Sequence, residues 1–238
     1  MSNNNPFLSV VIASYNSAHA LEKNLPVLCN YLANTSYSHE ILVVDDGSTD
    51  NGLTRTICEK NSCTYLKLDT NQGKGAAIKH GMLSANGKYR IFTDADIPYE
   101  PEVIEKFIYY LDFKEFDMVV GDRSIAGGNN YYSKVTKSRS LASKVFSFIV
   151  GRFIAGGIFD TQCGIKGFKA NIAQSIFESS RINGFAFDVE LFHIALLKNY
   201  DIKRVPVVLR SQDGKSVNLL KNSIGMLFDL IKIISHKY

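Results

Sequence analysis

Two carboxylates stand one residue apart in the segment RIFTDADIPYEP, residues 90–101, directly after a short apolar run. Alternate residues of an extended chain point to the same side, so Asp94 and Asp96 can converge on one point. Convergent carboxylates in a cleft favour a hard cation, Mg²⁺ or Mn²⁺, whose remaining ligands are water and substrate phosphates. The alternative is an Asp-rich turn that caps the following helix, and the tripeptide DAD alone favours that alternative.

Two further polar clusters follow apolar runs in the same way. A Tyr-Asn pair follows the run at residues 8–14, and the turn-rich DDGSTDNG ends the run at residues 40–45. In open α/β sheets, ligands bind beyond the carboxyl ends of the strands. These clusters are therefore expected to face the same ligand as the acid pair.

A Gly-Lys-Gly triplet at residues 73–75 precedes a helical pattern. At the start of a helix, backbone N–H groups and the Lys74 ammonium can face an anion. The triplet is no Walker loop, because the required spacing and the Ser or Thr are missing. A glycine-rich helix start with a solvated lysine is the alternative.

The pattern of the first 120 residues predicts the sheet that these clusters require. Short β-branched runs, of the kind buried in parallel sheets, alternate here with helical patterns. Such alternation is typical of an open α/β sheet of the doubly wound type. The expected strands cover residues 8–14, 40–45, 64–68, 89–93 and 116–120.

The alternation ends after Arg123, where a Gly/Asn-rich basic segment is followed by a strongly apolar one. No linker is long enough to split the chain, so a single domain over residues 1–238 is expected. The chain is 45% hydrophobic and 21% charged, which is an ordinary globular composition.

The charge and the cysteines narrow the class of protein further. A net charge of +4 is too weak to indicate nucleic acid, but it suits an anionic substrate or an acidic membrane surface. No run reaches the roughly 18 apolar residues of a membrane span. The four cysteines lack metal spacing and follow no secretory signal, which predicts free thiols in a reducing cytoplasm.

The ordered set of motifs resembles a known family. SVVIASYN, ILVVDDGSTDNG, NQGKGAAIKHGMLSANGKY and FTDADIPYEP, in this order and spacing, resemble family-2 glycosyltransferases of GT-A fold. VVGDRS, DTQCGIKGFKA, GFAFDVELF and VPVVLRSQDGKSVNLLKNS resemble its polyprenyl-phosphate branch, with the dolichyl-phosphate glucosyltransferases closer than the mannose synthases. The resemblance implies a Rossmann-like, mostly parallel sheet flanked by helices. It also implies a nucleotide-sugar half at about 7–122 and an acceptor half at about 123–238.

The resemblance assigns a donor site for a nucleotide diphosphate sugar. Asp94 and Asp96 would hold the metal and the diphosphate, and Asp46 would bind the base or ribose unless it only closes a local turn. The chain has Ala13 where the family usually has Pro, and Pro98 where mannose synthases carry Gln, which disfavours a mannose donor. The positions that match donor contacts are Ala13, Tyr15, Val44, Asp46, Lys74, Asp94, Ala95, Arg210 and Lys215.

The resemblance also assigns acceptor and catalytic residues. Arg123 would lie near the transferring phosphate, with Arg139 and Ser143 clamping the acceptor phosphate, because guanidinium pairs with phosphate through two hydrogen bonds. Asp160 and Asp188 join Asp96 as candidate catalytic acids. A phosphate acceptor is already anionic at neutral pH, so these two acids need only orient other groups.

Two amphipathic segments predict contact with an anionic membrane surface. Both have an apolar side and flanking basic residues, which suits insertion at a membrane surface. The alternative for each is a core helix of the second half. The apolar positions are Leu141, Val145, Phe148 and Ile149 in the first, and Leu220, Ile224, Leu227, Phe228 and Ile231 in the second.

The resemblance, together with these features, implies an inverting, metal-dependent hexose transfer from a UDP-glucose-like donor to a polyprenyl phosphate, in a cytoplasmic protein peripheral to the membrane. A saccharide acceptor in surface-polysaccharide synthesis is the alternative within the same class. A nucleotidyltransferase would need a Gly-rich phosphate loop after the first strand, and ASYNSAHA is not one. A non-enzymatic nucleotide-sugar binding module is disfavoured by the intact acid pair.

Overall fold

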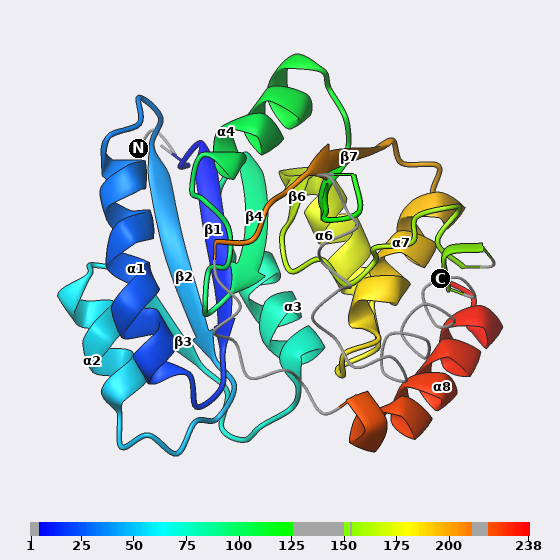
Figure 1. Ribbon diagram of the computed structural model, residues 1–238, viewed down its shortest axis with the longest axis horizontal. Coiled ribbons are helices and arrows are strands. Elements are labelled where there is room, and N and C mark those ends of the chain that lie inside the picture. The colour runs from blue at the N-terminus through cyan, green and yellow to red at the C-terminus, as the bar shows by residue number, and fades with distance from the viewer. Residues whose placement is uncertain (1–4, 126–149, 153, 211–218) are drawn as a thin grey trace.

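A seven-stranded sheet with helices on both faces forms the centre of the computed structural model, which describes residues 5–125, 150–152, 154–210 and 219–238 (Figure 1). The strand order is β3-β2-β1-β4-β6-β5-β7. The strands are β1 (Leu8–Ser14), β2 (His39–Asp45), β3 (Thr64–Lys67), β4 (Tyr89–Asp94), β5 (Met118–Asp122), β6 (Lys166–Lys169) and β7 (Ile202–Pro206). All pairings are parallel except those of β6, which confirms the open, mostly parallel α/β sheet.

The helices form two layers because the strands are apolar on both faces. Val10 and Ile12 of β1 face one hydrophobic core and Val11 faces the other, as the two-residue period of a strand requires. One core contains α1 (Ala18–Ala33), α2 (Leu53–Lys60) and α4 (Val103–Ile108), which continues into the π-helical turn η1 (Tyr109–Phe113). The other contains α3 (Lys74–Ser84), α6 (Ala170–Ser179), α7 (Phe187–Leu197) and α8 (Leu219–Ser235).

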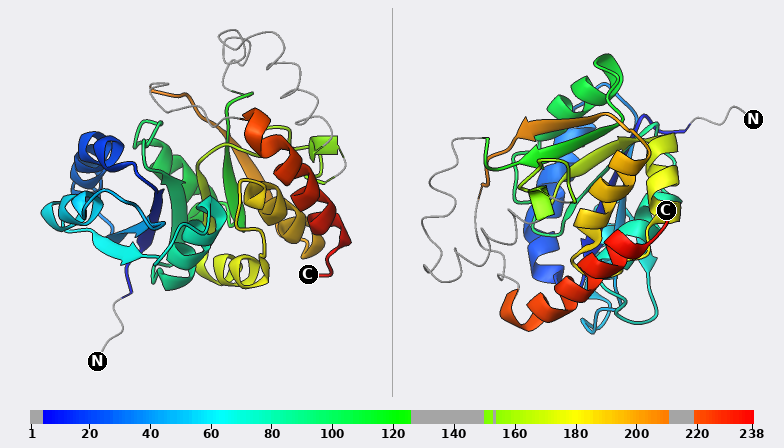
Figure 2. Two further views of the ribbon diagram at one scale, coloured as in Figure 1. Left: turned by 90° about the horizontal axis from the view of Figure 1, so that it is seen from below. Right: turned by 90° about the vertical axis from the view of Figure 1, so that its right-hand side faces the viewer.

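The helix α8 lies on the outside of the molecule against α7 (Figure 2). Leu230 and Ile233 are buried against the core, whereas Phe228, Ile231 and Ile234 are exposed by 63%, 57% and 61%. Within the described residues, no helix is both long and apolar enough to cross a membrane.

The strand β6 is an antiparallel insertion that the sequence pattern did not predict. It pairs with β4 on one side and β5 on the other, so β5 contacts β6 and β7 but not β4. Its four residues, KGFK, show no apolar alternation, and its first residue, Lys166, is fully buried. The insertion brings Gly164, in the loop that precedes β6, against Asp94 at the carboxyl end of β4.

The cysteines are free thiols, as predicted. Cys29 on α1 and Cys63 before β3 nevertheless place their sulfur atoms 3.6 Å apart. The hydrogen bond from Cys63 lowers the pKa of the Cys29 thiol below its ordinary value.

Candidate active site

The predicted clusters meet at the edge formed by the carboxyl ends of the parallel strands. Ala13 of β1 is paired in register with Val44 of β2 on one side and with Asp94 of β4 on the other. Tyr15, on the loop after β1, is 48% exposed beside this edge. Three of the predicted donor positions are therefore neighbours in one sheet.

The acid pair has the properties of a cation site. Asp94 Oδ1 lies 2.5 Å from Lys74 Nζ, while Asp96 Oδ1 is buried and has no hydrogen-bond partner. Burial, together with the charge of Asp94, raises the pKa of Asp96 above its ordinary value. A buried, unpaired carboxylate oxygen next to a second carboxylate is an environment that Mg²⁺ or Mn²⁺ fits, since such ions use few protein carboxylates and take water and phosphate besides. The described residues contain no cluster of three or more acidic, His or Cys ligands, so substrate and water would complete the coordination.

The backbone around the acid pair is tightly constrained. Ile97 has a φ of 40°, which is costly for a β-branched residue, and its N–H donates to the carbonyl of Asp94 at 3.0 Å. Gly164, on the loop before β6, approaches Asp94 so closely that an added Cβ would overlap the Asp94 carboxylate. The position of this carboxylate therefore depends on the absence of a side chain at Gly164.

The Asp46 carboxylate fastens the Gly-rich turn. Its oxygens accept hydrogen bonds from the backbone N–H groups of Gln72 at 2.8 Å and Gly73 at 2.9 Å. The local turn in DDGS is closed by Asp45 instead, whose Oδ1 accepts from Ser48 N at 2.9 Å. A contact between Asp46 and a base or ribose stays a prediction.

Two of the backbone N–H groups at the start of α3, which were expected to face an anion, are paired within the protein instead. The carbonyl of Asn183 accepts from Gly75 N at 2.8 Å and from Ala76 N at 3.4 Å. The loop that carries Asn183 thus caps α3 from within the protein. The Lys74 ammonium remains as the charge that this turn directs at the acid pair.

The Lys74 ammonium is enclosed by carboxylates. Its side chain is 21% exposed, and its Nζ lies 5.8 Å from the ring centre of Phe187. Burial lowers the pKa of Lys74, but attraction to Asp94 and Asp188 outweighs this effect and raises the pKa. The lysine is therefore charged at neutral pH.

Asp188 is buried and is the second carboxylate that attracts Lys74. Its Oδ1 lies 2.5 Å from Lys166 Nζ, and the two side chains are 5% and 0% exposed. Lys166 Nζ also donates to the carbonyl of Cys163 at 2.9 Å. A carboxylate held in this way favours an orienting role for Asp188 over proton transfer.

Asp160 binds Arg123 through both of its carboxylate oxygens. Its Oδ2 accepts from Arg123 N at 2.8 Å and from Nε at 2.9 Å, and its Oδ1 accepts from Nη2 at 2.5 Å. Both oxygens of the 7% exposed Asp160 side chain are engaged, so this acid fixes the guanidinium after β5. The geometry again favours orientation over proton transfer.

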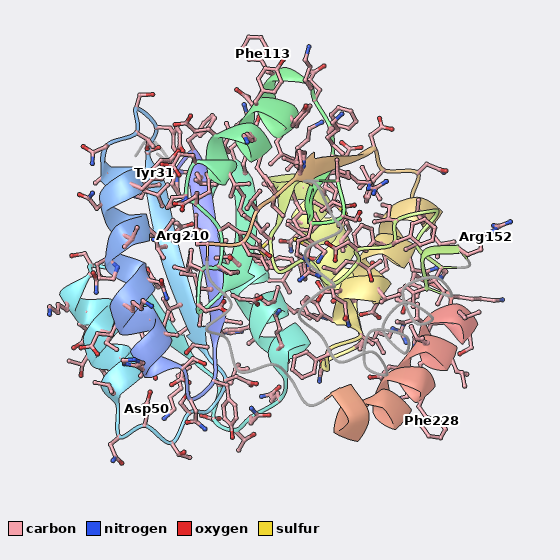
Figure 3. The ribbon with its side chains drawn as sticks, in the orientation of Figure 1. Tyr31, Asp50, Phe113, Arg152, Arg210 and Phe228 are labelled. Atoms are coloured by element: carbon pink, nitrogen blue, oxygen red, sulfur yellow. The ribbon has the colours of Figure 1, made fainter. Side chains whose placement is uncertain are left out.

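The remaining predicted residues are spread over the C-terminal part. Arg210 lies over the loop that follows the acid pair, because its N–H donates to the carbonyl of Pro98 at 2.7 Å and its Nε lies 3.3 Å from Glu100 (Figure 3). Ala95 is buried between the two acids. Arg139, Ser143 and Lys215 lie outside the described residues.

Sequence reasoning missed Gly164 and Asn183. The Asn-Gly pair at residues 183–184, a turn signal between apolar runs, marked the loop but not its contact with α3. No sequence signal distinguishes Gly164 from a glycine in an ordinary turn, since its role comes from a neighbour 70 residues earlier in the chain.

Comparison with known proteins agrees with this geometry. Residues 9–177 match the family described as Glycosyl transferase family 2. The dolichyl-phosphate beta-glucosyltransferase of Saccharomyces cerevisiae is 34% identical over 248 residues, which cover 95% of this chain and 74% of the relative. The proteins of the same name from Dictyostelium discoideum and Homo sapiens are each 32% identical, cover 96% and 95% of this chain, and are themselves covered to 74%.

Solved structures show the same fold. Glucosyl-3-phosphoglycerate synthase from Mycobacterium tuberculosis in complex with UDP has a TM-score of 0.73 at 16% identity, covering 98% of this chain and 82% of its own. Its complex with Mn²⁺, UDP and glucosyl-3-phosphoglycerate gives a TM-score of 0.69 at 16% identity, over 98% and 81% of the two chains. The chain belongs to glycosyltransferase family 2 and is a glycosyltransferase built on the GT-A fold.

Proposed function

We propose that this enzyme transfers a glucosyl group, with inversion, from a UDP-glucose-type donor to a polyprenyl phosphate of the dolichyl-phosphate type. The observation that carries the proposal is the similarity of 95% of the chain, at 34% identity, to a relative named dolichyl-phosphate beta-glucosyltransferase. The paired acids after β4 and the fixed arginine after β5 supply the two charges that such a transfer needs. The acids suit a cation on the donor diphosphate, and the arginine suits an acceptor phosphate.

In the proposed reaction, an oxygen of the acceptor phosphate attacks the anomeric carbon, and the bond from that carbon to the nucleotide diphosphate breaks. A divalent cation held by Asp94 and Asp96 would stabilise the negative charge of the departing diphosphate. Arg123, held in place by Asp160, would align the acceptor phosphate for in-line attack. Lys74 would add a further positive charge on the donor side.

No general base is required in this mechanism. The nucleophile is a phosphate oxygen that is already anionic at neutral pH. Asp160 and Asp188, the carboxylates that could otherwise accept a proton, form ion pairs with Arg123 and Lys166. Their proposed role is to position these two cations.

We also propose that the outer face of α8 contacts the membrane that contains the lipid acceptor. Phe228 and Ile231 were predicted to lie on an amphipathic face, and both are more than half exposed, with Phe228 pointing away from the molecule (Figure 3). Ile234 extends the same face. An apolar face that does not pack on the protein core suits insertion at the level of the lipid headgroups. The apolar positions of the first predicted segment, Leu141, Val145, Phe148 and Ile149, lie outside the described residues.

The test is a transfer assay with purified enzyme, comparing UDP-glucose with GDP-mannose, dolichyl phosphate with no lipid, and Mn²⁺ with a chelator. The expected product is a glucosylated lipid phosphate that forms only with UDP-glucose, lipid and metal. Arg123→Ala should lower transfer at least about a hundredfold while UDP affinity changes little, as expected for loss of charge stabilisation in the transition state. Arg55→Ala, which removes a surface arginine on α2, is the control. Glucose transfer to a saccharide but not to lipid phosphate would contradict the proposed acceptor.

A further inference from the structure

The charges behind the acid pair form a connected cluster. Asp94 is paired with Lys74, and Asp188 is paired with the fully buried Lys166, while Asp96 has no cationic partner within hydrogen-bonding distance among the described residues. With its two lysines and three aspartates, the cluster carries a single net negative charge. A divalent cation at the acid pair therefore enters a site in which a lysine already neutralises one of its two carboxylates.

Lys74 is held so that its charge stays at this site. The turn before it is fastened by the Asp46 carboxylate, and the first turn of α3 is capped by the carbonyl of Asn183. Its ammonium lies 5.8 Å from the ring centre of Phe187, and both Asp94 and the buried Asp188 attract it.

We propose that Lys74 is a built-in competitor of the divalent cation, so that the acid pair binds metal tightly only together with a nucleotide diphosphate. The inference rests on the proposed function, in which Asp94 and Asp96 hold a metal against the donor diphosphate. A positive charge within a few ångström repels a divalent ion, and Lys74 also occupies one oxygen of Asp94. A diphosphate supplies acceptor oxygens for the ammonium and ligands for the metal, which removes both obstacles. Binding of metal and nucleotide is then cooperative, and each raises the affinity for the other by the same factor.

Asp188 and Lys166 have a supporting role in this scheme. Without Lys166, Asp188 would be a buried carboxylate with no ion-pair partner among the described residues, and it would attract the Lys74 ammonium more strongly in competition with Asp94. Lys166 is thus a positioning residue, which acts on the metal site through Asp188 and Lys74.

The experiment measures free Mn²⁺ by electron paramagnetic resonance during titration of the purified protein, with and without UDP. The wild type should bind Mn²⁺ weakly alone and at least about tenfold more tightly with UDP, the size expected for one unit charge near a divalent ion in a water-exposed site. Lys74→Met should bind Mn²⁺ alone at least about tenfold more tightly than the wild type, and UDP should then add little. Lys74→Arg keeps the charge and should bind Mn²⁺ alone as weakly as the wild type.

Lys79→Met is the matched control, because Lys79 lies on the same helix but donates to the carbonyl of Ser180 and touches no carboxylate of the cluster. Its Mn²⁺ affinity should equal that of the wild type. If Lys74→Met does not fold, as judged by circular dichroism, Lys74→Gln replaces it, since its amide can still hydrogen-bond Asp94. If the folded neutral variant binds Mn²⁺ no more tightly than the wild type, while UDP still increases Mn²⁺ binding by the wild type, the inference is wrong and the proposed function is unaffected. Absence of Mn²⁺ binding to the wild type even with UDP would overturn the metal role in the proposed function, and the inference with it.

Discussion

At the scale of a single side chain, Asp96 differs from the other polar groups around the candidate site. Most polar groups around the site are paired within the protein, including both oxygens of Asp46 and of Asp160. Asp96 instead keeps a buried oxygen without a partner, and folding is destabilised by that desolvated charge. A stable protein retains such a group where a ligand satisfies it.

Replacement of Asp96 by Asn should therefore abolish metal-dependent donor binding and at the same time stabilise the metal-free fold. The stabilisation should be on the order of 1 kcal/mol at pH 7, because a buried unpaired charge is removed. Since the folded state raises the pKa of Asp96, its protonated form is favoured by folding, and the wild type loses stability as the pH rises through the raised value. Urea denaturation in a chelator at pH 7 and at pH 4 measures this. The advantage of the variant should shrink at the lower pH, and a variant less stable than the wild type at pH 7 would contradict the argument.

A side chain at Gly164 should disturb the position of the Asp94 carboxylate. The Cβ of Gly164→Ala would overlap the Asp94 carboxylate, so this carboxylate or the loop before β6 must move, at a cost of about 1–3 kcal/mol. We expect a folded protein with strongly weakened metal and donor binding, measured by calorimetric titration of UDP with Mn²⁺. Gly225→Ala on α8, where an added Cβ meets no atom within 4 Å, should bind the donor like the wild type. Equal binding by both variants would show that Asp94 has room to move.

At the scale of elements, the sequence predicted five strands to within about two residues at each end, because buried parallel strands have a strong apolar signal. Leu21, Leu25 and Leu28 of α1 recur at helical spacing, and all three are buried. The sequence pattern missed β6, whose short sequence has neither alternation nor a continuous apolar run. Charged residues inside the fold, such as Lys166, could not be predicted, since their partners come from distant parts of the chain.

The outer face of α8 should bind membranes without stabilising the fold. Phe228→Ser combined with Ile231→Ser removes two exposed apolar side chains, so the melting temperature should change little while sedimentation with anionic vesicles falls. Leu230→Ser combined with Ile233→Ser changes the buried face of the same helix and should lower the melting temperature instead. Added salt should weaken vesicle binding of the wild type, because the chain carries a net charge of +4. Vesicle binding that survives the outer substitutions would contradict the assignment of this face.

The thiols of Cys29 and Cys63 should form a disulfide under mild peroxide. Their sulfur atoms are 3.6 Å apart, and the lowered pKa of Cys29 favours its thiolate as the sulfur that peroxide oxidises to a sulfenic acid, with release of water. The Cys63 sulfur then attacks the sulfenic acid and displaces a second water to form the disulfide. The bond would link α1 to the segment before β3, at the end of the sheet away from the acid pair, so transfer activity should persist. Mass spectrometry should show the loss of two hydrogen atoms, reversed by a thiol reductant and absent in Cys63→Ser. Peroxide-treated wild type without this bond would show that the backbone holds the sulfur atoms too far apart.

At the scale of the whole molecule, the order of the motifs along the chain predicted the fold class and placed the candidate site at one edge of the sheet. It did so because parallel strands bring their carboxyl ends to one edge. The sequence also grouped Ala13, Val44 and Asp94, which are neighbours in the sheet. Pairings between residues far apart in the sequence, including those of Arg123 with Asp160 and of Gly75 with Asn183, could be seen only in three dimensions.

The antiparallel insertion also determines the order in which this chain can fold during synthesis. A ribosome releases β5 well before β6, yet β5 has no neighbour in the sheet until β6 and β7 have emerged. The first four strands can pair at once, whereas β5 must wait for a segment more than 40 residues later, and such non-local pairing is slow. A fragment ending at Asp122 should therefore aggregate, with β4 left as an open edge, and this can be measured by size-exclusion chromatography. In hydrogen exchange of the full chain, β5, β6 and β7 should lose protection together, so that the half of the molecule bearing Arg123 matures as one late unit.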